Sequence, residues 1–307
     1  MLQGGVNIKR LSSYIKLGKD EIKKRADELF GRLSKCDICP KNCMVNRLKN
    51  STGSCKSNDK VMVSSFNLHF GEESVISGYR GSGAIFFTNC PLTCKFCLNY
   101  RASQLGEGKT ISIKDLSEMM LILQNKGAHN INLITPTHYL PHILLALTLA
   151  IPKGLNIPIV YNTSGYEKVE ILKFLDGIVD IYLPDFKYAD NNIACLLSST
   201  PDYPEIAKWA IKEMFRQVGN LKVNNGLVES GLIIRHLVLP NYIDNSKKVL
   251  SVIKETIGTS VTISLMSQYF PSFRVVNDEK LGRRITNDEF QEVINYAKKL
   301  GFCSLIT

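Results

Sequence analysis

Three cysteines close together on one loop place the strongest constraint on this chain of 307 residues. Cys90, Cys94 and Cys97 have the spacing C-x3-C-x2-C and come directly after the apolar run 83–87. Three thiolates on a short loop can hold three corners of a cubic iron–sulfur cluster and leave the fourth iron without a protein ligand. Such an open iron can bind and activate a substrate. The alternative is a zinc ion that has a distant fourth ligand, whereas the polar residues between the cysteines argue against a buried trio that serves packing alone.

The number of cysteines and the N-terminal residues favour a cytoplasmic location. The chain has nine cysteines, an odd number, and seven of them lie between Cys36 and Cys97. This arrangement does not fit the disulfide framework of a secreted protein. The segment Met1–Arg10 lacks the apolar stretch of a secretory signal, and no apolar run reaches membrane-spanning length. We therefore expect a protein of the reducing cytoplasm that uses its clustered thiols to bind metal and has no membrane partner.

The net charge allows two interpretations. Lysine and arginine number 38 against 28 aspartates and glutamates, which gives a formal net charge of +10. This excess can attract an anionic partner such as RNA, or it can reflect a well-solvated surface. No stripe of aromatic and basic residues accompanies the charge, and the run Lys23–Arg25 is typical of an exposed helix face. We favour the solvated surface and keep nucleic acid as the less favoured partner.

The pattern after residue 83 predicts the fold. Short β-branched runs alternate with amphipathic stretches, which is typical of βα units around a parallel sheet. Strands are expected at 84–88, 132–135, 157–161, 179–183, 232–239 and 261–266. Helices are expected at 112–127, 141–151, 168–175, 204–218, 246–257 and 288–300. This order predicts an α/β fold, a partial (β/α)6 TIM-like barrel, in which reactive groups gather at the C-terminal ends of the strands.

The first 80 residues do not follow this alternation. We expect a polar helix at 20–33, a metal-bound loop at 36–55 and one or two strands within 60–68. The chain therefore divides into a small N-terminal module, residues 1–80, with a helix and a four-cysteine metal site, and a barrel domain, residues 81–307, against which the module packs.

A second cysteine group lies in this N-terminal module. Cys36, Cys39, Cys43 and Cys55 have the spacing C-x2-C-x3-C-x11-C. Four thiolates can close the ligand shell of a structural zinc or of an auxiliary iron–sulfur cluster. Because Cys39-Pro40 resembles the Cys-Pro step of ferredoxin-type loops, we favour iron–sulfur. The polar neighbours argue against four free thiols.

The cysteine loop, with aromatic Phe96 just before its third cysteine, resembles the signature of the radical S-adenosylmethionine (SAM) superfamily. Further segments are similar to one branch, the PflX-type proteins related to pyruvate formate-lyase activating enzyme. These segments are 67–73, 80–83, 127–132, 135–138 and 183–188. The resemblance covers nearly the whole chain from Cys36 onward.

This resemblance implies an enzyme with a 4Fe–4S cluster and SAM as cofactors. Reductive cleavage of SAM would give a 5'-deoxyadenosyl radical that abstracts hydrogen from a substrate, and the protein would position the cofactor and exclude competing reactions. An activase-like oxidoreductase would act on a protein or peptide and take its electron from a donor such as flavodoxin or ferredoxin. The alternatives are a radical SAM enzyme that modifies RNA, and a non-enzymatic iron–sulfur or zinc protein that transfers electrons or serves as a scaffold.

The resemblance also implies which residues bind SAM. Asp185 and Lys187 match an Asp-x-Lys pattern after the fourth strand, and Arg235 matches an arginine in the fifth. Asn162 and Ser164 belong to an Asn-Thr-Ser-Gly segment that stands where activases have Asp-Thr-Asn-Gly. Because Asp185 and Lys187 are two residues apart on an extended chain, their side chains point the same way. Lys187 can therefore pair with the SAM carboxylate. A surface ion pair is the alternative for these two residues.

One segment departs from the activase pattern. The residues Thr135-Pro136-Thr137-His138 stand where activases have Gly-Gly-Glu, which receives the methionine amino group. The hydroxyl of Thr137 or a backbone carbonyl, such as that of Thr135, can accept the ammonium group, but a carboxylate role does not carry over. Gln268 near the sixth strand is a candidate for a base edge of the adenine, and Phe96 completes the expected cofactor-binding residues.

Overall fold

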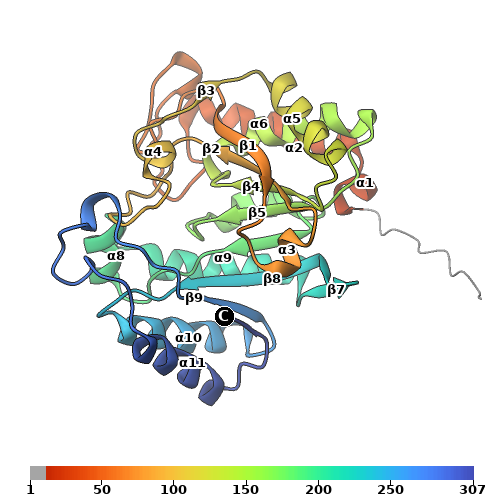
Figure 1. Cartoon of the computed structure of the whole chain (residues 1–307). Coiled ribbons are helices and arrows are strands. Elements are labelled where there is room, and N and C mark those ends of the chain that lie inside the picture. The colour runs from red at the N-terminus through yellow and green to blue at the C-terminus, as the bar shows by residue number, and fades with distance from the viewer. Residues whose placement is uncertain (1–11) are drawn as a thin grey trace, which may run out of the picture.

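The computed structural model describes residues 12–307, and its centre is a row of six parallel strands (Figure 1). They are β2 (Ser82–Phe87), β4 (Ile131–Ile134), β5 (Ile159–Thr163), β6 (Ile181–Pro184), β8 (Leu227–Leu237) and β9 (Thr262–Met266). They pair in this order and correspond to the six predicted strands. The predicted α/β fold of the TIM-like barrel type is confirmed.

Four further strands extend this sheet. β10 (Leu305–Ile306) lies parallel beside β9, β1 (Met62–His69) is antiparallel to β2, and β3 (Lys109–Thr110) is antiparallel to β1. β7 (Lys222–Asn224) forms a hairpin with the start of β8. This hairpin explains why β8 begins five residues before the predicted strand at 232–239, since the prediction covered only its parallel part.

The helices lie outside the parallel strands. They include α5 (Ile113–Asn125), α6 (Leu140–Ala150), α9 (Tyr203–Val218), α10 (Ile243–Ile257) and α11 (Asn287–Leu300), as Figure 1 shows. β4 and β6 are buried along their whole length, as expected for parallel strands that are covered on both faces. Ser112 and Asp115 form the predicted capping box, and Gly301 ends α11 with a φ of 96°.

Several helical segments differ from the prediction, among them the short helices α3 (Ser74–Ser77) and α4 (Tyr100–Ser103), which were not predicted. The stretch 168–175 is α7 (Val169–Leu172) followed by the 3-10 turn η5 (Lys173–Leu175). The helix α8 (Asn191–Ser198) was not predicted, although Asp190 caps its first amides as an N-cap aspartate does. Its eight residues are too few to give a strong helical period.

The N-terminal part packs directly on the barrel. α1 (Ser13–Leu17) leads into α2 (Lys19–Gly31), which covers most of the predicted helix at 20–33 and packs against α6. Ile22 and Leu29 are fully buried in the core that the barrel residues form. The division of the chain at residue 80 stays a prediction.

One short helix lies on the inner side of the barrel. α3 (Ser74–Ser77) follows β1, and its Ile76 is buried against Val160, Leu183 and Ile233, which belong to three different parallel strands. This packing holds the preceding residues Glu72 and Glu73 inside the barrel. No helix within residues 12–307 has the length and apolar character that crossing a bilayer requires.

Candidate active site at the carboxyl ends of the strands

The Cys90–Cys97 loop is held in place by three different segments. It follows β2, at the carboxyl end of the parallel strands. The amide of Lys95 donates to the carbonyl of Leu197 in α8 (2.9 Å), and the amide of Arg274 donates to the carbonyl of Lys95 (3.0 Å). The side chain of Gln104 donates to the carbonyl of Leu92 (3.0 Å). The loop therefore keeps its shape through contacts with distant parts of the chain.

Each of the three sulfur atoms has a hydrogen-bond partner. Ser198 of α8 donates to Cys94 Sγ (3.0 Å), and the Ser103 hydroxyl lies 3.1 Å from Cys97 Sγ. The amide of Leu92 donates to Cys90 Sγ (3.4 Å). Hydrogen bonds to the sulfurs are a means by which proteins tune iron–sulfur clusters.

Burial opposes ionisation of these thiols in the absence of metal. It raises the pKa of Cys90 well above its usual value, and it raises the pKa of Cys94, whereas Lys187 and Ser198 act in the opposite direction on Cys94. A coordinated metal deprotonates a thiol outright. The loop therefore depends on the positive charge of bound iron to become a set of thiolates.

The arrangement of the sulfurs differs from that of a single-ion site. Within residues 12–307, no three histidine, cysteine, aspartate or glutamate side chains surround one point as ligands of one metal ion. A cubic cluster requires a different ligand arrangement, because each cysteine binds a separate iron atom. The three thiols of the loop, each with a polar partner, are suitable ligands for such a cluster.

Asp185 and Lys187 lie where the sequence predicted, after β6, and form an ion pair. Both side chains are about one-fifth exposed (24% and 18%), so the pair is not a fully solvated surface pair. Burial lowers the pKa of Lys187, but Asp185 and Cys94 oppose it and hold the pKa above its usual value. A cation therefore lies beside the cysteine loop.

Arg235 of β8 is already paired with two carboxylates. Its Nε donates to Glu73 Oε1 (2.9 Å), its Nη2 donates to Glu73 Oε2 (2.7 Å), and its Nη2 also contacts Glu72. Glu72 Oε1 in turn accepts from Asn132 (2.9 Å) and Asn162 (3.4 Å). Arg235 holds the pKa of Glu73 below its usual range against the effect of burial. The predicted ligand Arg235 thus belongs to a buried charge network that α3 brings into the barrel.

The strand ends of β4, β5, β6 and β8 meet at this level. Asp185 forms a backbone bridge with Arg235, whose Nη1 lies 3.5 Å from Asn162 Oδ1. The amide of Thr135 donates to the carbonyl of Asn162 (2.9 Å), and Thr135 has a φ of 60°. A β-branched residue with positive φ is strained by about 1–3 kcal/mol, and such strain is concentrated at functional sites.

A tyrosine connects the loops after β5 and β6 through hydrogen bonds to their backbone. The Tyr203 hydroxyl donates to the carbonyls of Ser164 (2.8 Å) and Asp185 (2.9 Å) and accepts from the amide of Lys187 (3.0 Å). Gly165 approaches Asp185 so closely that an added Cβ would lie 2.2 Å from its carbonyl oxygen. Only glycine fits there.

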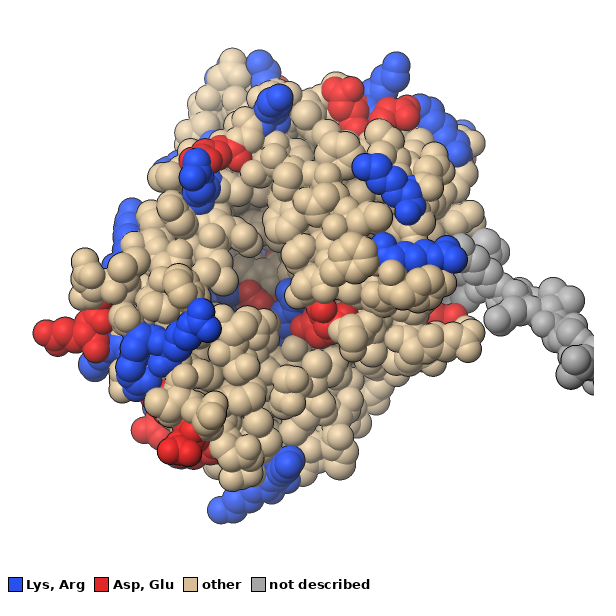
Figure 2. All heavy atoms as spheres, viewed as in Figure 1, with Lys and Arg blue, Asp and Glu red and all other residues tan. Residues whose placement is uncertain are grey.

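Figure 2 shows a hollow near the middle of the face that it draws, with acidic and basic side chains inside it. Phe96 is buried and makes an edge contact with Tyr269, which follows β9. Gln268 is exposed at the end of the same strand. The predicted roles of both residues stay predictions.

Thr137 lies next to a buried acid. Its side chain is 1% exposed, and its hydroxyl donates to Glu167 Oε1 (2.5 Å), which also accepts from Thr163. A ligand that uses this hydroxyl would have to replace Glu167 as its partner, and the role of Thr137 as a cofactor residue stays a prediction. Burial raises the pKa of Glu167 to about 7, although both threonines lower it.

We predict that Glu167→Gln removes a pH-dependent loss of stability. The carboxyl group has a usual pKa of 4.5 and a folded-state pKa of about 7, so the folded protein favours the protonated form. Protonation of Glu167 therefore stabilises the folded state. This stabilisation is fully present below pH 4.5 and is lost as the pH rises through 7, which lowers the free energy of unfolding by about 3 kcal/mol in total. At pH 8 the variant should be more stable than the wild type in urea unfolding, with little difference at pH 5. Glu170→Gln, on the exposed side of α7, is the control. Parallel pH profiles of wild type and Glu167→Gln would contradict this assignment.

The four N-terminal cysteines also lie near one another, although within residues 12–307 no three of them are arranged as ligands of one metal ion. Burial, together with the smaller effect of the nearby Cys55, Cys36 and Cys43, raises the pKa of Cys39 to about 12. The amide of Ser54 donates to Cys43 Sγ (3.2 Å), and an added Cβ on neighbouring Gly53 would lie 2.7 Å from that sulfur. Non-glycine residues with positive φ are frequent in this loop, namely Asn42, Met44, Asn50 and Lys56. The backbone therefore bends tightly around a group of thiols.

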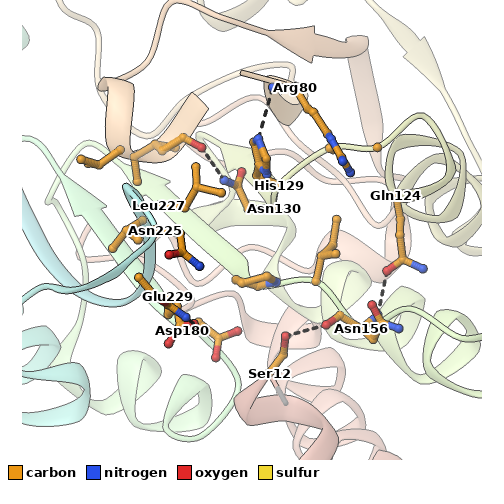
Figure 3. Close-up of a pocket in the computed structure, with 18 of the residues that line it drawn as sticks. Ser12, Arg80, Gln124, His129, Asn130, Asn156, Asp180, Asn225, Leu227 and Glu229 are labelled. Carbon is orange, nitrogen blue, oxygen red and sulfur yellow. Dashed lines mark hydrogen bonds between the residues drawn. The ribbon is translucent and has the colours of Figure 1, made fainter. Parts of the chain in front are cut away.

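A cavity of about 440 Å³ lies at the opposite end of the barrel (Figure 3). Its lining residues Asn130, Pro158 and Asp180 come directly before β4, β5 and β6, at the amino ends of the strands. Several labelled polar groups are engaged in internal hydrogen bonds, such as Gln124 with the amide of Asn156 (2.8 Å). In barrels this end usually serves stability. The cavity is thus separate from the cysteine loop.

Sequence reasoning missed the residues that support the site from a distance. These are Glu72, Glu73, Glu167, Ser198, Tyr203 and Arg47. The acidic pair was visible in the segment 67–73, but nothing local showed that it enters the barrel. Ser198 reaches Cys94 across 104 positions of the chain.

The cysteine loop and the following strands match a known family. A profile described as "Radical SAM superfamily" matches residues 84–224. The chain is also 32% identical over 274 residues to "Uncharacterized protein MJ0674" of Methanocaldococcus jannaschii, which covers 86% of this chain and 74% of that protein.

Solved structures overlap with the chain at lower similarity. Streptococcus suis SuiB bound to precursor peptide SuiA has 14% identity and a TM-score of 0.48, over 72% of this chain and 47% of that one. HydG, a maturase of the FeFe hydrogenase, has 14% identity and a TM-score of 0.49, over 71% and 49%. Native anSMEcpe with bound AdoMet and the Cp18Cys peptide has 11% identity and a TM-score of 0.47, over 71% and 60%. The chain spans about half the length of SuiB and HydG.

Proposed function

Because the chain belongs to the radical SAM superfamily, whose members use a 4Fe–4S cluster and SAM, we propose that Cys90, Cys94 and Cys97 hold this cluster and that the enzyme abstracts hydrogen from a protein or peptide. Cys90, Cys94 and Cys97 would hold the cluster, which would supply one electron for the reductive cleavage of SAM to methionine and a 5'-deoxyadenosyl radical. The observation that carries the proposal is the loop itself: three thiols, each with a hydrogen-bond partner, next to the Asp185–Lys187 ion pair that follows β6.

The charges beside the loop suit a zwitterionic ligand. Lys187 is a partly buried cation near Cys94, so it would stabilise negative charge on that thiolate and can pair with a ligand carboxylate. Asp185 orients Lys187 and can accept a hydrogen bond from an ammonium or hydroxyl group. Tyr203 holds the backbone of both residues, which keeps their positions fixed while a ligand binds.

The remaining predicted residues complete the proposed cofactor site. They are Phe96, Thr135, Thr137, Asn162, Ser164, Arg235 and Gln268. Asn162 and Arg235 lie in the same network as Glu72, so they can shape the site through that carboxylate as well as by direct contact. Thr135 offers a backbone carbonyl at a strand end.

Exposed apolar side chains beside the loop support a protein or peptide substrate. Leu98 (55% exposed) follows the third cysteine, and Phe270 (48%) follows Tyr269, which contacts Phe96. Val276 (54%) follows the 3-10 turn η6 (Phe273–Val275), where Phe273 stacks on Tyr100. An exposed apolar patch is typical of a surface that binds another protein, and these side chains are candidates for such a patch. The activase-like role, with a flavodoxin or ferredoxin as electron donor, belongs to this proposal.

We also propose that Cys36, Cys39, Cys43 and Cys55 bind a second metal centre. An iron–sulfur cluster is favoured, with zinc as the alternative. The convergence of four buried or half-buried thiols supports it. Iron and zinc analysis of anaerobically purified protein decides between the two metals.

Anaerobic SAM cleavage tests the proposed function. The protein is reconstituted with iron and sulfide, reduced with dithionite and mixed with SAM, and the nucleoside products are separated by chromatography. We expect 5'-deoxyadenosine in amounts that depend on reductant. If none forms under any reducing condition, the electron-transfer or scaffold alternative is favoured instead.

RNA as a substrate makes a different prediction. On the face shown in Figure 2, Lys and Arg side chains are scattered among acidic and neutral ones. RNA binding would have to be tight and strongly salt-dependent to support modification of RNA. Filter binding at two salt concentrations therefore separates this alternative from a protein substrate.

A further inference from the structure

Arg47 is a buried cation without an acidic partner. It lies on the 3-10 turn η2 (Arg47–Lys49) and is 1% exposed. Its guanidinium donates to two carbonyl groups, that of Asn58 (3.0 Å from Nε and 2.6 Å from Nη2) and that of His138 (2.8 Å from Nη1). Within the described part of the chain, it forms no ion pair with a carboxylate. A buried charge that meets only neutral acceptors is costly, and proteins rarely leave it uncompensated.

A further neighbour of the guanidinium is a cysteine sulfur. Nη1 lies 3.9 Å from Cys36 Sγ. A neutral thiol is a weak acceptor and brings no charge, but a metal-bound thiolate does. Four thiolates outweigh the positive charge of a zinc ion or of a cubic iron–sulfur core, so a loaded centre on this loop is anionic. Metal binding by the N-terminal cysteines therefore gives Arg47 a counter-charge that it lacks at ion-pair distance within the described residues.

The same side chain joins this loop to the strand-end site. His138 belongs to the turn η3 (Thr137–Tyr139) after β4, and its Nε2 lies 2.8 Å from the carbonyl of Thr88, two residues before Cys90. A second path runs in parallel, since Asn89 donates to Ser57 Oγ (3.2 Å) and Ser57 donates to the carbonyl of Cys55 (3.3 Å). The two cysteine groups are therefore connected through short hydrogen-bond paths.

We propose that Arg47 is a positioning residue that provides the counter-charge for an anionic metal centre on Cys36, Cys39, Cys43 and Cys55 and fixes this centre to the turn beside the Cys90–Cys97 loop. The inference rests on the second metal centre of the proposed function and does not depend on SAM cleavage.

Metal retention tests the counter-charge. All variants carry alanine at Cys90, Cys94 and Cys97, so that only the N-terminal centre is loaded, with iron and sulfide or with zinc alone. Arg47→Met should lose the centre to a chelator at about 10- to 100-fold lower chelator concentration, as for other changes beside metal ligands. Arg47→Lys should recover part of the retention because it restores the charge. Lys49→Met, on the exposed side of the same turn, is the matched control and should behave like the parent. Equal retention in Arg47→Met and the parent overturns the proposal.

A thermal cycle excludes a purely structural role. Arg47→Met should lower the unfolding midpoint of the metal-loaded protein. It should lower the midpoint by less when the four N-terminal cysteines are serine, because the bonds to the two carbonyls are still lost but no counter-charge is. Chelator-treated protein provides the same comparison if the serine variant does not fold. Equal lowering with and without metal means that the guanidinium serves only the carbonyls, and the proposal fails.

The outcomes also separate this inference from the proposed function. A wild-type protein that holds metal at the N-terminal cysteines but forms no 5'-deoxyadenosine contradicts the proposed function and leaves the assignment of Arg47 intact. A protein that binds neither iron nor zinc at these four cysteines overturns the assignment of Arg47.

Discussion

Replacing Cys94 with alanine is expected to abolish the formation of 5'-deoxyadenosine. The open iron exists only if three thiolates hold the other three corners, and Cys94 is the buried member of the loop. Its sulfur also accepts a hydrogen bond from Ser198 and interacts with Lys187, and the substitution removes this sulfur. The product is measured by chromatography after reconstitution and reduction, together with the iron content.

Two controls make this prediction specific. Cys303→Ala changes an exposed cysteine near β10 and should retain full activity. Cys39→Ala changes the N-terminal group and should leave some uncoupled cleavage, because that group is not the origin of the radical. If Cys94→Ala forms product at the rate of the wild type, the loop is not the site of cleavage.

Removing the charge of Arg235 should destabilise the protein strongly. Arg235→Met leaves Glu72 and Glu73 buried without a cation, and breaking a buried pair in this way costs about 3–5 kcal/mol. The free energy of unfolding is measured in urea on metal-free protein, so that no cluster contributes. The loss should be visible at pH 7, where both carboxyl groups are ionised in the unfolded chain.

Substitution of Glu72 and Glu73, the partners of Arg235, tests whether unpaired buried carboxylates cause this loss of stability. The variant Glu72→Gln/Glu73→Gln/Arg235→Met contains no buried charge at this place and should recover most of the lost stability. If Arg235→Met costs the same with and without the two glutamine changes, lost packing of the long side chain explains the effect, and the account of a buried charge network is wrong.

Local patterns were sufficient to predict most of the fold. The six parallel strands, the capping box at Ser112 and the end of α11 at Gly301 follow from short-range periodicity and backbone chemistry. The pair Asp185 and Lys187 also followed from position, since residues two apart on an extended chain share a face. Each of these features depends on residues that are close in sequence.

The supporting parts of the site depend on long-range packing. α3 has only four residues, and its place inside the barrel results from the packing of Ile76 on distant strands, so the sequence did not show that Glu72 and Glu73 would meet Arg235. Arg47 is typical of an exposed residue by composition but is buried against another segment. Such contacts become visible only when the chain is folded.

The most direct test of the central claim is electron–nuclear double resonance on the reduced protein with SAM isotopically labelled in its amino nitrogen and carboxylate oxygens. Alanine at Cys36, Cys39, Cys43 and Cys55 leaves one cluster to observe. We predict that SAM changes the spectrum of this cluster and that both labels show magnetic coupling to it, because the iron without a protein ligand binds them. A spectrum that SAM does not alter, with no coupling from either label, would contradict the account.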